Sequence, residues 1–262
     1  MRPLYAACWA EFLKARRAGM FPITTLALCL APLFGALFVV ILRNPQLAAG
    51  NEALRAKATL TGFTPDWPSF FGLIAQAVGV GGLVVFGFVT AWVFGREYSD
   101  KTLKDLFTLP IRRTTTVVAK LITCLLWCMW ITATTTVFGM VTGALLQLPG
   151  WDLGMFFTSM LHICTTATLT ILLCPVVAFT AAVGKGYLIP LGFVILTIVT
   201  GQIIGALGFG AYYPWAIPAL HSGLGSEAGG GVGPISYLLD VSAGMAGTGA
   251  LIYWWNFVDE SK

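Results

Sequence analysis

Residues Trp67–Gly95 read WPSFFGLIAQAVGVGGLVVFGFVTAWVFG, and this stretch contains no Asp, Glu, Lys or Arg. A helix needs roughly 20 apolar residues to cross the hydrocarbon core of a bilayer. Lipid offers no partner for an unpaired backbone N–H or C=O, so only helices and closed barrels cross it. The stretch lacks the alternation of apolar and polar residues that barrel strands show. It therefore predicts a membrane-spanning helix.

The rest of the chain has the same apolar character. Hydrophobic residues make up 57% of the 262 residues and charged residues 10%, whereas charged residues form about a quarter of an ordinary soluble domain. We therefore expect one all-α integral membrane domain over residues 1–262. Its six transmembrane helices are expected at about residues 21–42, 69–94, 116–146, 156–183, 187–208 and 234–257.

The basic residues predict the orientation. Six spans place both termini on one side, and the opposite side carries only Arg43, Arg55 and Lys57 of the 15 Lys and Arg residues. By the positive-inside rule the termini are cytoplasmic. Orientation accounts for most of the net charge of +4, and we expect no nucleic-acid partner because no basic soluble module is evident. The six cysteines lie in predicted spans or on the cytoplasmic side, which indicates no disulfide framework.

The segment before the first span is amphipathic. In a helix over about residues 3–17, the apolar side chains fall on one side, and Glu11, Lys14 and Arg17 fall on the other. Such a helix would lie in the membrane interface with its apolar side toward lipid. It is either a simple anchor or a lever that links a cytoplasmic partner to the first span. The segment does not fit a cleaved signal peptide, so residues 21–42 are expected to remain a span.

A charged segment joins the second and third predicted spans. Residues 94–113 read FGREYSDKTLKDLFTLPIRR, and we expect a short amphipathic helix over about residues 100–109 that Pro110 ends. Acidic residues lie among the basic ones, which favours a protein partner over anionic lipid. A helix that only lies on lipid is the alternative. The apolar face of the expected helix consists of Leu103, Leu106 and Phe107.

The sequence REYSDKTLKDLFTLPIRRTTTVVAK (residues 96–120) resembles the cytoplasmic loop of ABC transporter permeases of the type-2 exporter family, in which a coupling helix docks on the ATPase subunit. The sequence AEFLKARRAGM (residues 10–20) resembles the E-x-x-K-x-x-R start of the bacitracin-resistance and lantibiotic-immunity branch. The six-span layout matches over the whole chain. The resemblance implies leader roles for Glu11 and Lys14. It implies ATPase-coupling roles for Glu97, Thr102, Leu103, Pro110 and Arg113, to which the apolar face adds Leu106 and Phe107.

The resemblance implies the transmembrane subunit of an ABC exporter in the cytoplasmic membrane of a bacterium. The subunit would pair with a second permease chain, identical or different, and with two ATPase subunits, and would move an amphipathic peptide or lipid-like compound outward. The chain has no G-x-x-x-x-G-K-[ST] motif, because Gly184-Lys185 lacks the upstream Gly and the following Ser or Thr. ATP and Mg²⁺ would therefore bind the partner. No cofactor or metal is expected in this chain.

Four polar residues inside predicted spans are candidates for the substrate path: Asp240, His162, Gln76 and Gln202. An intramembrane carboxylate is costly to bury unpaired, but Asp240 lies close enough to the outer end of its span to be simply solvated. The other three fit helix–helix hydrogen bonds equally well.

An intramembrane enzyme is not indicated, since the chain has no G-x-S-x-G, no H-E-x-x-H and no paired intramembrane carboxylates. We expect no catalytic residue. The alternatives to an exporter subunit are a non-transporting assembly or sensory subunit and a secondary carrier.

Overall fold

The computed structural model describes residues 2–44, 63–100, 112–224 and 231–257. Within these ranges the chain is helical and contains no strand, which confirms the predicted all-α fold class. The helices are α1 (Arg2–Arg17), α2 (Met20–Arg43), α4 (Trp67–Gln76), α5 (Gly82–Ser99), α7 (Arg113–Leu145), α8 (Leu153–Leu172), α9 (Cys174–Val183), α10 (Leu188–Ala206), α11 (Ile217–His221) and α12 (Pro234–Phe257). A π-helical turn, η1 (Ala77–Gly81), joins α4 to α5, and two 3-10 turns, η2 (Gly210–Tyr212) and η3 (Pro214–Ala216), precede α11.

Six stretches of the described residues are long and apolar enough to span a membrane, so the predicted multi-pass architecture is confirmed. They are Met20–Arg43, Trp67–Ser99, Arg113–Leu145, Leu153–Val183, Leu188–Ala206 and Pro234–Phe257. The second span continues to Ser99, whereas the sequence predicted an end near residue 94. The helix continues because its charged residues find partners: Arg96 Nε lies 2.9 Å from Asp100 Oδ2 one turn later, and Glu97 is paired as described below.

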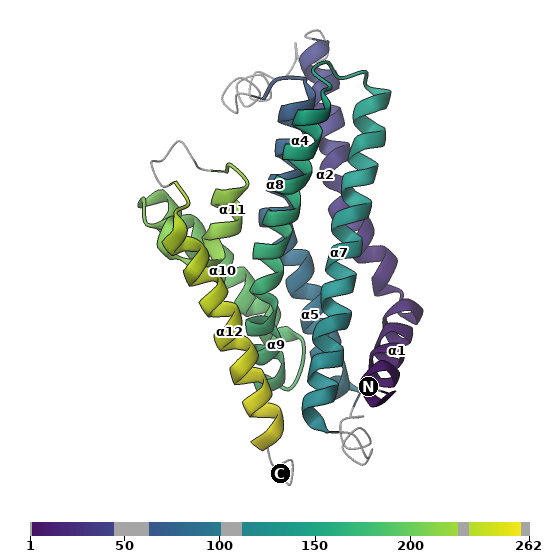
Figure 1. Cartoon of the computed structure of the whole chain (residues 1–262), viewed down its shortest axis with the longest axis vertical. Helices are drawn as coiled ribbons and strands as arrows, with labels where there is room; N and C mark the ends of the chain where they lie inside the picture. Colours follow the sequence, from purple (N-terminus) through teal and green to yellow (C-terminus); the bar gives the residue numbers. More distant parts are fainter. Residues whose placement is uncertain (1, 45–62, 101–111, 225–230, 258–262) are drawn as a thin grey trace.

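The spans run along the long axis of the molecule, and the start of α1 and the end of α12 lie at the same end of the bundle (Figure 1). We call this the terminal end. Spans two and three each contain 33 residues, which at about 1.5 Å per residue is about 50 Å, compared with roughly 30 Å of hydrocarbon. At the end opposite the terminal end, α2, α4, α7 and α8 extend further than α10, α11 and α12 (Figure 1).

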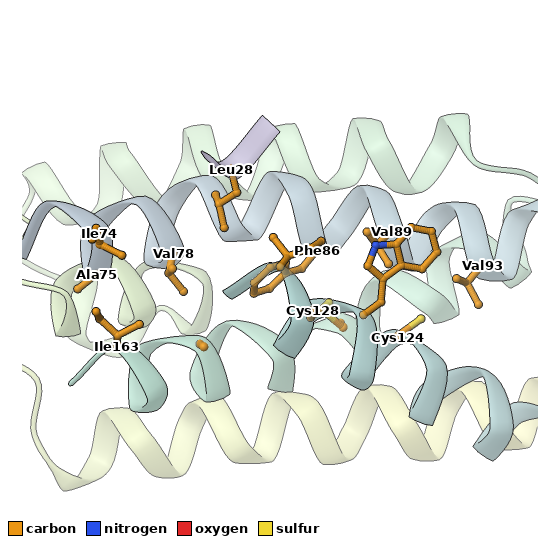
Figure 2. Packing of buried hydrophobic residues seen from close by; sticks show 14 of the residues in the cluster. Leu28, Ile74, Ala75, Val78, Phe86, Val89, Val93, Cys124, Cys128 and Ile163 are labelled. Atoms are coloured by element: carbon orange, nitrogen blue, oxygen red, sulfur yellow. The ribbon is translucent and has the colours of Figure 1, made fainter. Parts of the chain in front are cut away.

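The hydrophobic core lies between the second span, α7 and the α8–α9 pair. Ile74, Val78 and Phe86 from the second span are fully buried, together with Cys128 from α7 and Ile163 from α8 (Figure 2). Many large apolar side chains on the outer surface are exposed instead. A monomeric soluble protein rarely exposes so much contiguous apolar surface, whereas lipid accommodates it without cost.

The segment after α10 packs back on the bundle. The sequence predicted no helix between the spans expected at about 187–208 and 234–257, but the described first part of this connection forms η2, η3 and α11, with Ile217 buried. Pro218 stands in the first turn of α11, where its missing N–H is not needed. A Cβ at Gly79 in η1 would lie 2.7 Å from the Pro218 carbonyl oxygen. Only glycine therefore lets α11 approach the second span this closely.

Candidate functional site

Helix α1 directs Glu11 into the bundle and exposes its aromatic side, whereas Lys14 and Arg17 remain exposed. Glu11 is 6% exposed, whereas Tyr5 is 73% and Trp9 57% exposed. The sequence alone supplied no partner for Glu11. In the structure α1 lies along α7 (Figure 1), and the Glu11 carboxylate meets a lysine of that helix. The exposed aromatic side is the side that we expect to face lipid.

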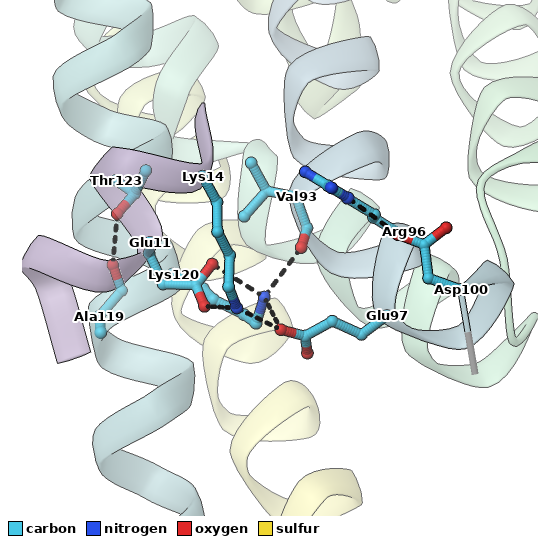
Figure 3. Close-up of polar contacts among 9 residues, drawn as sticks. All are labelled: Glu11, Lys14, Val93, Arg96, Glu97, Asp100, Ala119, Lys120 and Thr123. Atoms are coloured by element: carbon cyan, nitrogen blue, oxygen red, sulfur yellow. Dashed lines mark hydrogen bonds and ion pairs between the residues drawn. The ribbon is translucent and has the colours of Figure 1, made fainter. Parts of the chain in front are cut away.

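Two lysines and two glutamates form a connected group at the terminal end, which we call the ion cluster: Glu11, Lys14, Glu97 and Lys120 (Figure 3). Lys120 Nζ lies 3.1 Å from Glu11 Oε2 and 2.9 Å from Glu97 Oε1. It also donates to the Val93 carbonyl oxygen at 3.0 Å. Lys14 Nζ lies 2.7 Å from Glu11 Oε1 and 3.2 Å from Glu97 Oε1. Each lysine therefore bridges the same two carboxylates.

The ion cluster is formally neutral and largely shielded from water. Lys120 has a side chain that is 1% exposed, whereas that of Lys14 is 45% exposed. Burial by itself raises the pKa of Glu11, but Lys120 and Lys14 lower it more, so this pKa lies below its usual 4.5. Burial lowers the pKa of Lys14, but Glu11 and Glu97 raise it more, so it lies above 10.5. Both groups are therefore charged at neutral pH.

One carboxylate oxygen of the ion cluster accepts no hydrogen bond from the described residues. Glu97 Oε2 is buried and has no hydrogen-bond partner among the described residues. A buried, unpaired oxygen of this kind costs free energy, so Glu97 is the member of the cluster with spare capacity to accept a hydrogen bond. Glu97 lies in the last turn of α5, directly before the segment that the sequence predicted to couple to an ATPase.

The ion cluster joins α1 to the two helices that flank the predicted coupling segment. The predicted helix at about residues 100–109 lies outside the described residues, as do Thr102, Leu103, Leu106, Phe107 and Pro110. The two described members of the coupling set, Glu97 and Arg113, stand on either side of it. Arg113 Nη1 donates to the Trp255 carbonyl oxygen at 3.3 Å. The start of α7 is thereby held to the end of α12 as well.

From the sequence, Lys120 was only one of the basic residues expected on the cytoplasmic side. Its position carried a signal, because it lies about two turns inside a helix whose neighbouring residues are apolar. A lysine there needs a carboxylate partner. The partner's identity depends on the tertiary fold, since Glu11 lies far from Lys120 in the sequence.

The four substrate-path candidates do not share one site. His162 stacks on His221 of α11, with ring centroids 4.8 Å apart. His221 Nε2 lies 2.8 Å from Thr165 Oγ1, and its Nδ1 lies 2.9 Å from the Tyr237 hydroxyl. Burial first, and His162 second, lower the pKa of His221, so its ring is neutral at pH 7. His221 was not among the sequence candidates because it lies between the fifth and sixth predicted spans, outside the membrane-spanning segments.

Asp240, Gln76 and Gln202 lie in separate surroundings. Asp240 is 0% exposed, and neither of its carboxyl oxygens has a hydrogen-bond partner among the described residues. The alternative that Asp240 is simply solvated is therefore not supported, because its side chain is buried within the single chain. Gln76 lines a groove of about 360 Å³ beside Phe34, and Gln202 lines another cavity of about 270 Å³ beside Trp215.

Comparison with known proteins adds an independent observation. The family model for ABC-2 family transporter proteins matches residues 7–201, a range that includes the whole ion cluster and ends before Gln202. The bacitracin transport permease protein BCRB of Bacillus licheniformis is 26% identical over 135 residues, which cover 52% of this chain and 65% of that protein. The chain thus spans about 65% of the length of that relative. No solved structure matches the chain.

Proposed function

This chain belongs to the ABC-2 transporter family, and we propose that it is the subunit through which a separate ATPase drives an exporter. Family membership makes it a transmembrane subunit of an ABC transporter with several spans. We propose that ATP and Mg²⁺ bind the partner ATPase. The ion cluster is the observation that carries the coupling part of the proposal.

The ion cluster supports a route from an ATPase to the spans. Glu97 lies two residues before the end of α5, and Lys120 lies about two turns into α7, so the segment between these helices is attached at both ends to paired charges. Glu11 brings α1 into the same group. A force on this segment would therefore move α5, α7 and α1 together as one packed unit. Packed elements that shift as rigid bodies are a common way to carry a conformational change.

The orientation and the partners follow from the same proposal. The terminal end faces the cytoplasm, in agreement with the distribution of Lys and Arg, and the ATPase binds there. A second permease chain completes the transport path, because one six-span bundle encloses too little space for a large substrate. The lipid-facing surface of the spans supports a location in the cytoplasmic membrane of a bacterium.

The substrate class is proposed from the relative. The name of the Bacillus licheniformis protein assigns it to bacitracin transport. For this chain we propose outward transport of an amphipathic peptide or a lipid-like compound. Asp240, His162, Gln76 and Gln202 remain candidates for contacts along that path.

The coupling proposal is tested by co-purifying the chain with candidate ABC ATPase subunits from the same organism. Leu106→Asp and Phe107→Asp place a charge on the predicted apolar face and should abolish co-purification. Lys104→Gln, on the predicted opposite face, is the matched control and should leave the complex intact. If the Leu106 and Phe107 variants assembled and stimulated the ATPase normally, the docking assignment would be wrong.

Glu97→Gln tests the transmission step separately. This variant removes the charge that Lys14 and Lys120 share but keeps the size of the side chain. We expect the complex to form while substrate-dependent stimulation of the ATPase falls at least tenfold. Normal stimulation in a folded Glu97→Gln complex would remove the ion cluster from the mechanism and leave docking untouched.

A non-transporting assembly or sensory subunit and a secondary carrier are the alternative functions. Substrate movement by reconstituted chain in vesicles without any ATPase would favour the carrier. Assembly with an ATPase but no substrate movement in either direction would favour the sensory subunit.

A further inference from the structure

A groove of about 730 Å³ opens at the terminal end of the bundle. It lies between the α1–α2 junction, the last turns of α5 and the start of α10. Its charged lining consists of Lys14, Arg17, Arg96 and Asp100. Three cations therefore face one carboxylate, and the groove carries an excess of positive charge.

The fold fixes one of these cations in place. The Arg96 guanidinium lies over the Trp92 ring, 4.9 Å from its centroid, and Arg96 Nε pairs with Asp100 (Figure 3). A Cβ at Gly95 would lie 2.8 Å from the backbone nitrogen of Tyr187. Glycine at this position lets the connection before α10 press against α5, which brings Tyr187 into the wall of the groove opposite Arg96.

Arg17 differs from the other two cations of the groove. It is exposed, and among the residues that the structure describes it makes no hydrogen bond or ion pair. Lys14 is engaged by Glu11 and Glu97. Arg17 and Arg96 line the same groove, and arginine is well suited to bind phosphate.

The groove changes from charged to apolar along the direction of the spans. Phe88 lies two turns before Arg96 on α5, and Leu191 lies one turn after Tyr187 on α10, and both line the groove. On α5, Trp92 lies between Phe88 and Arg96, and Tyr187 also lines the groove. Tryptophan and tyrosine favour the headgroup level of a membrane. The lining therefore matches a molecule with an anionic head and an apolar tail.

We propose that this groove binds the phosphate headgroup of an anionic membrane lipid. Arg17 and Arg96 contact the phosphate, and the first part of an acyl chain lies along Phe88 and Leu191. Lys14 lines the groove and also belongs to the ion cluster, so the bound headgroup sits next to the unit that we propose moves during coupling. The proposal does not depend on ATPase docking, and its test contains no ATPase.

The test is native mass spectrometry of the purified full chain with phosphatidylglycerol or with phosphatidylcholine of the same acyl chains. We expect phosphatidylglycerol to bind more tightly, and Arg17→Gln and Arg96→Gln each to weaken it about fivefold, the contribution of one basic residue at an anionic surface. Arg16→Gln is the matched control, because Arg16 is an exposed neighbour of Arg17 outside the lining. It should leave the affinity unchanged.

Four other results would contradict the proposal, and each would point to a different explanation. An equal loss in Arg16→Gln and Arg17→Gln would mean general surface attraction and would overturn the site. Equal binding of the two lipids would overturn the headgroup assignment. Displacement of the lipid by excess inorganic phosphate alone would overturn the requirement for a tail. A loss of dimer in Arg17→Gln without loss of lipid would assign the groove to a second copy of the chain. Arg17 is exposed, so we expect Arg17→Gln to leave the melting temperature unchanged. An unchanged melting temperature shows that weaker lipid binding by this variant does not come from a folding defect.

Discussion

Lys120 and Lys14 bridge the same two carboxylates, yet their replacement by glutamine should have very different effects on stability. The Lys120 side chain is 1% exposed and that of Lys14 is 45% exposed. Removing one partner of a buried ion pair costs about 3–5 kcal/mol, because the other charge stays buried without compensation. An exposed pair contributes only about 0.2–1 kcal/mol, because water screens it. We expect Lys120→Gln to cost about 3 kcal/mol more than Lys14→Gln.

The assay is reversible unfolding of the purified chain in detergent micelles, followed by tryptophan fluorescence. A difference of about 3 kcal/mol corresponds to roughly a hundredfold change in the folded-to-unfolded ratio. Arg16→Gln serves as the control, because an exposed side chain away from the ion cluster should change the free energy by less than about 0.5 kcal/mol. The double variant Glu11→Gln/Lys120→Gln isolates the pair itself: its loss should be smaller than the sum of the two single losses.

Two results would refute this reasoning. Equal losses for the two lysine variants would mean that burial does not set the energy of the ion cluster. Additive losses in the double variant would mean that Glu11 and Lys120 do not interact.

Three further predictions concern the pH response, a close helix contact and the histidine group. The pKa of Glu11 is lower in the folded chain than in the unfolded chain, so the unfolded chain binds a proton first as the pH falls. The free energy of unfolding should therefore decrease as the pH drops below about 4.5 toward the folded pKa. Glu11→Gln should weaken this decrease in unfolding curves measured at each pH. Gly79→Ala should lower stability by about 1–3 kcal/mol in the same assay, because its Cβ meets α11; Gly72→Ala, with open space around it on the same span, should not. Tyr237→Phe removes the hydroxyl bonded to His221 and should cost about 0.5–1.5 kcal/mol. A cost near zero would indicate that this hydrogen bond contributes no stability.

The helical spans could be predicted because hydropathy is a local property. A run such as Trp67–Gly95 has one stable state in lipid whatever surrounds it, and the predicted and observed ends of most spans differ by three residues or fewer. The end of the second span was placed five residues too early. There, Glu97 is helical because Lys120 neutralises it, and that partner is brought by a different helix.

Contacts between side chains that lie far apart in the sequence could not be predicted from it. His162 and Asp240 were identified as isolated polar residues, and the sequence offered nothing to place His221 beside the first or to show that the second is fully buried. Both outcomes depend on how α8, α11 and α12 pack. A pattern along one helix does not report which face of another helix it meets.

The six membrane helices, the family resemblance and the charged segment between the second and third spans could all be inferred from the amino-acid sequence. These properties follow from the composition and order of residues within short stretches. That Glu11, Lys14, Glu97 and Lys120 form one ion cluster became evident from the packing of the helices. A buried charge is tolerated only where an opposite charge reaches it, and α1, α5 and α7 must pack together before these side chains meet.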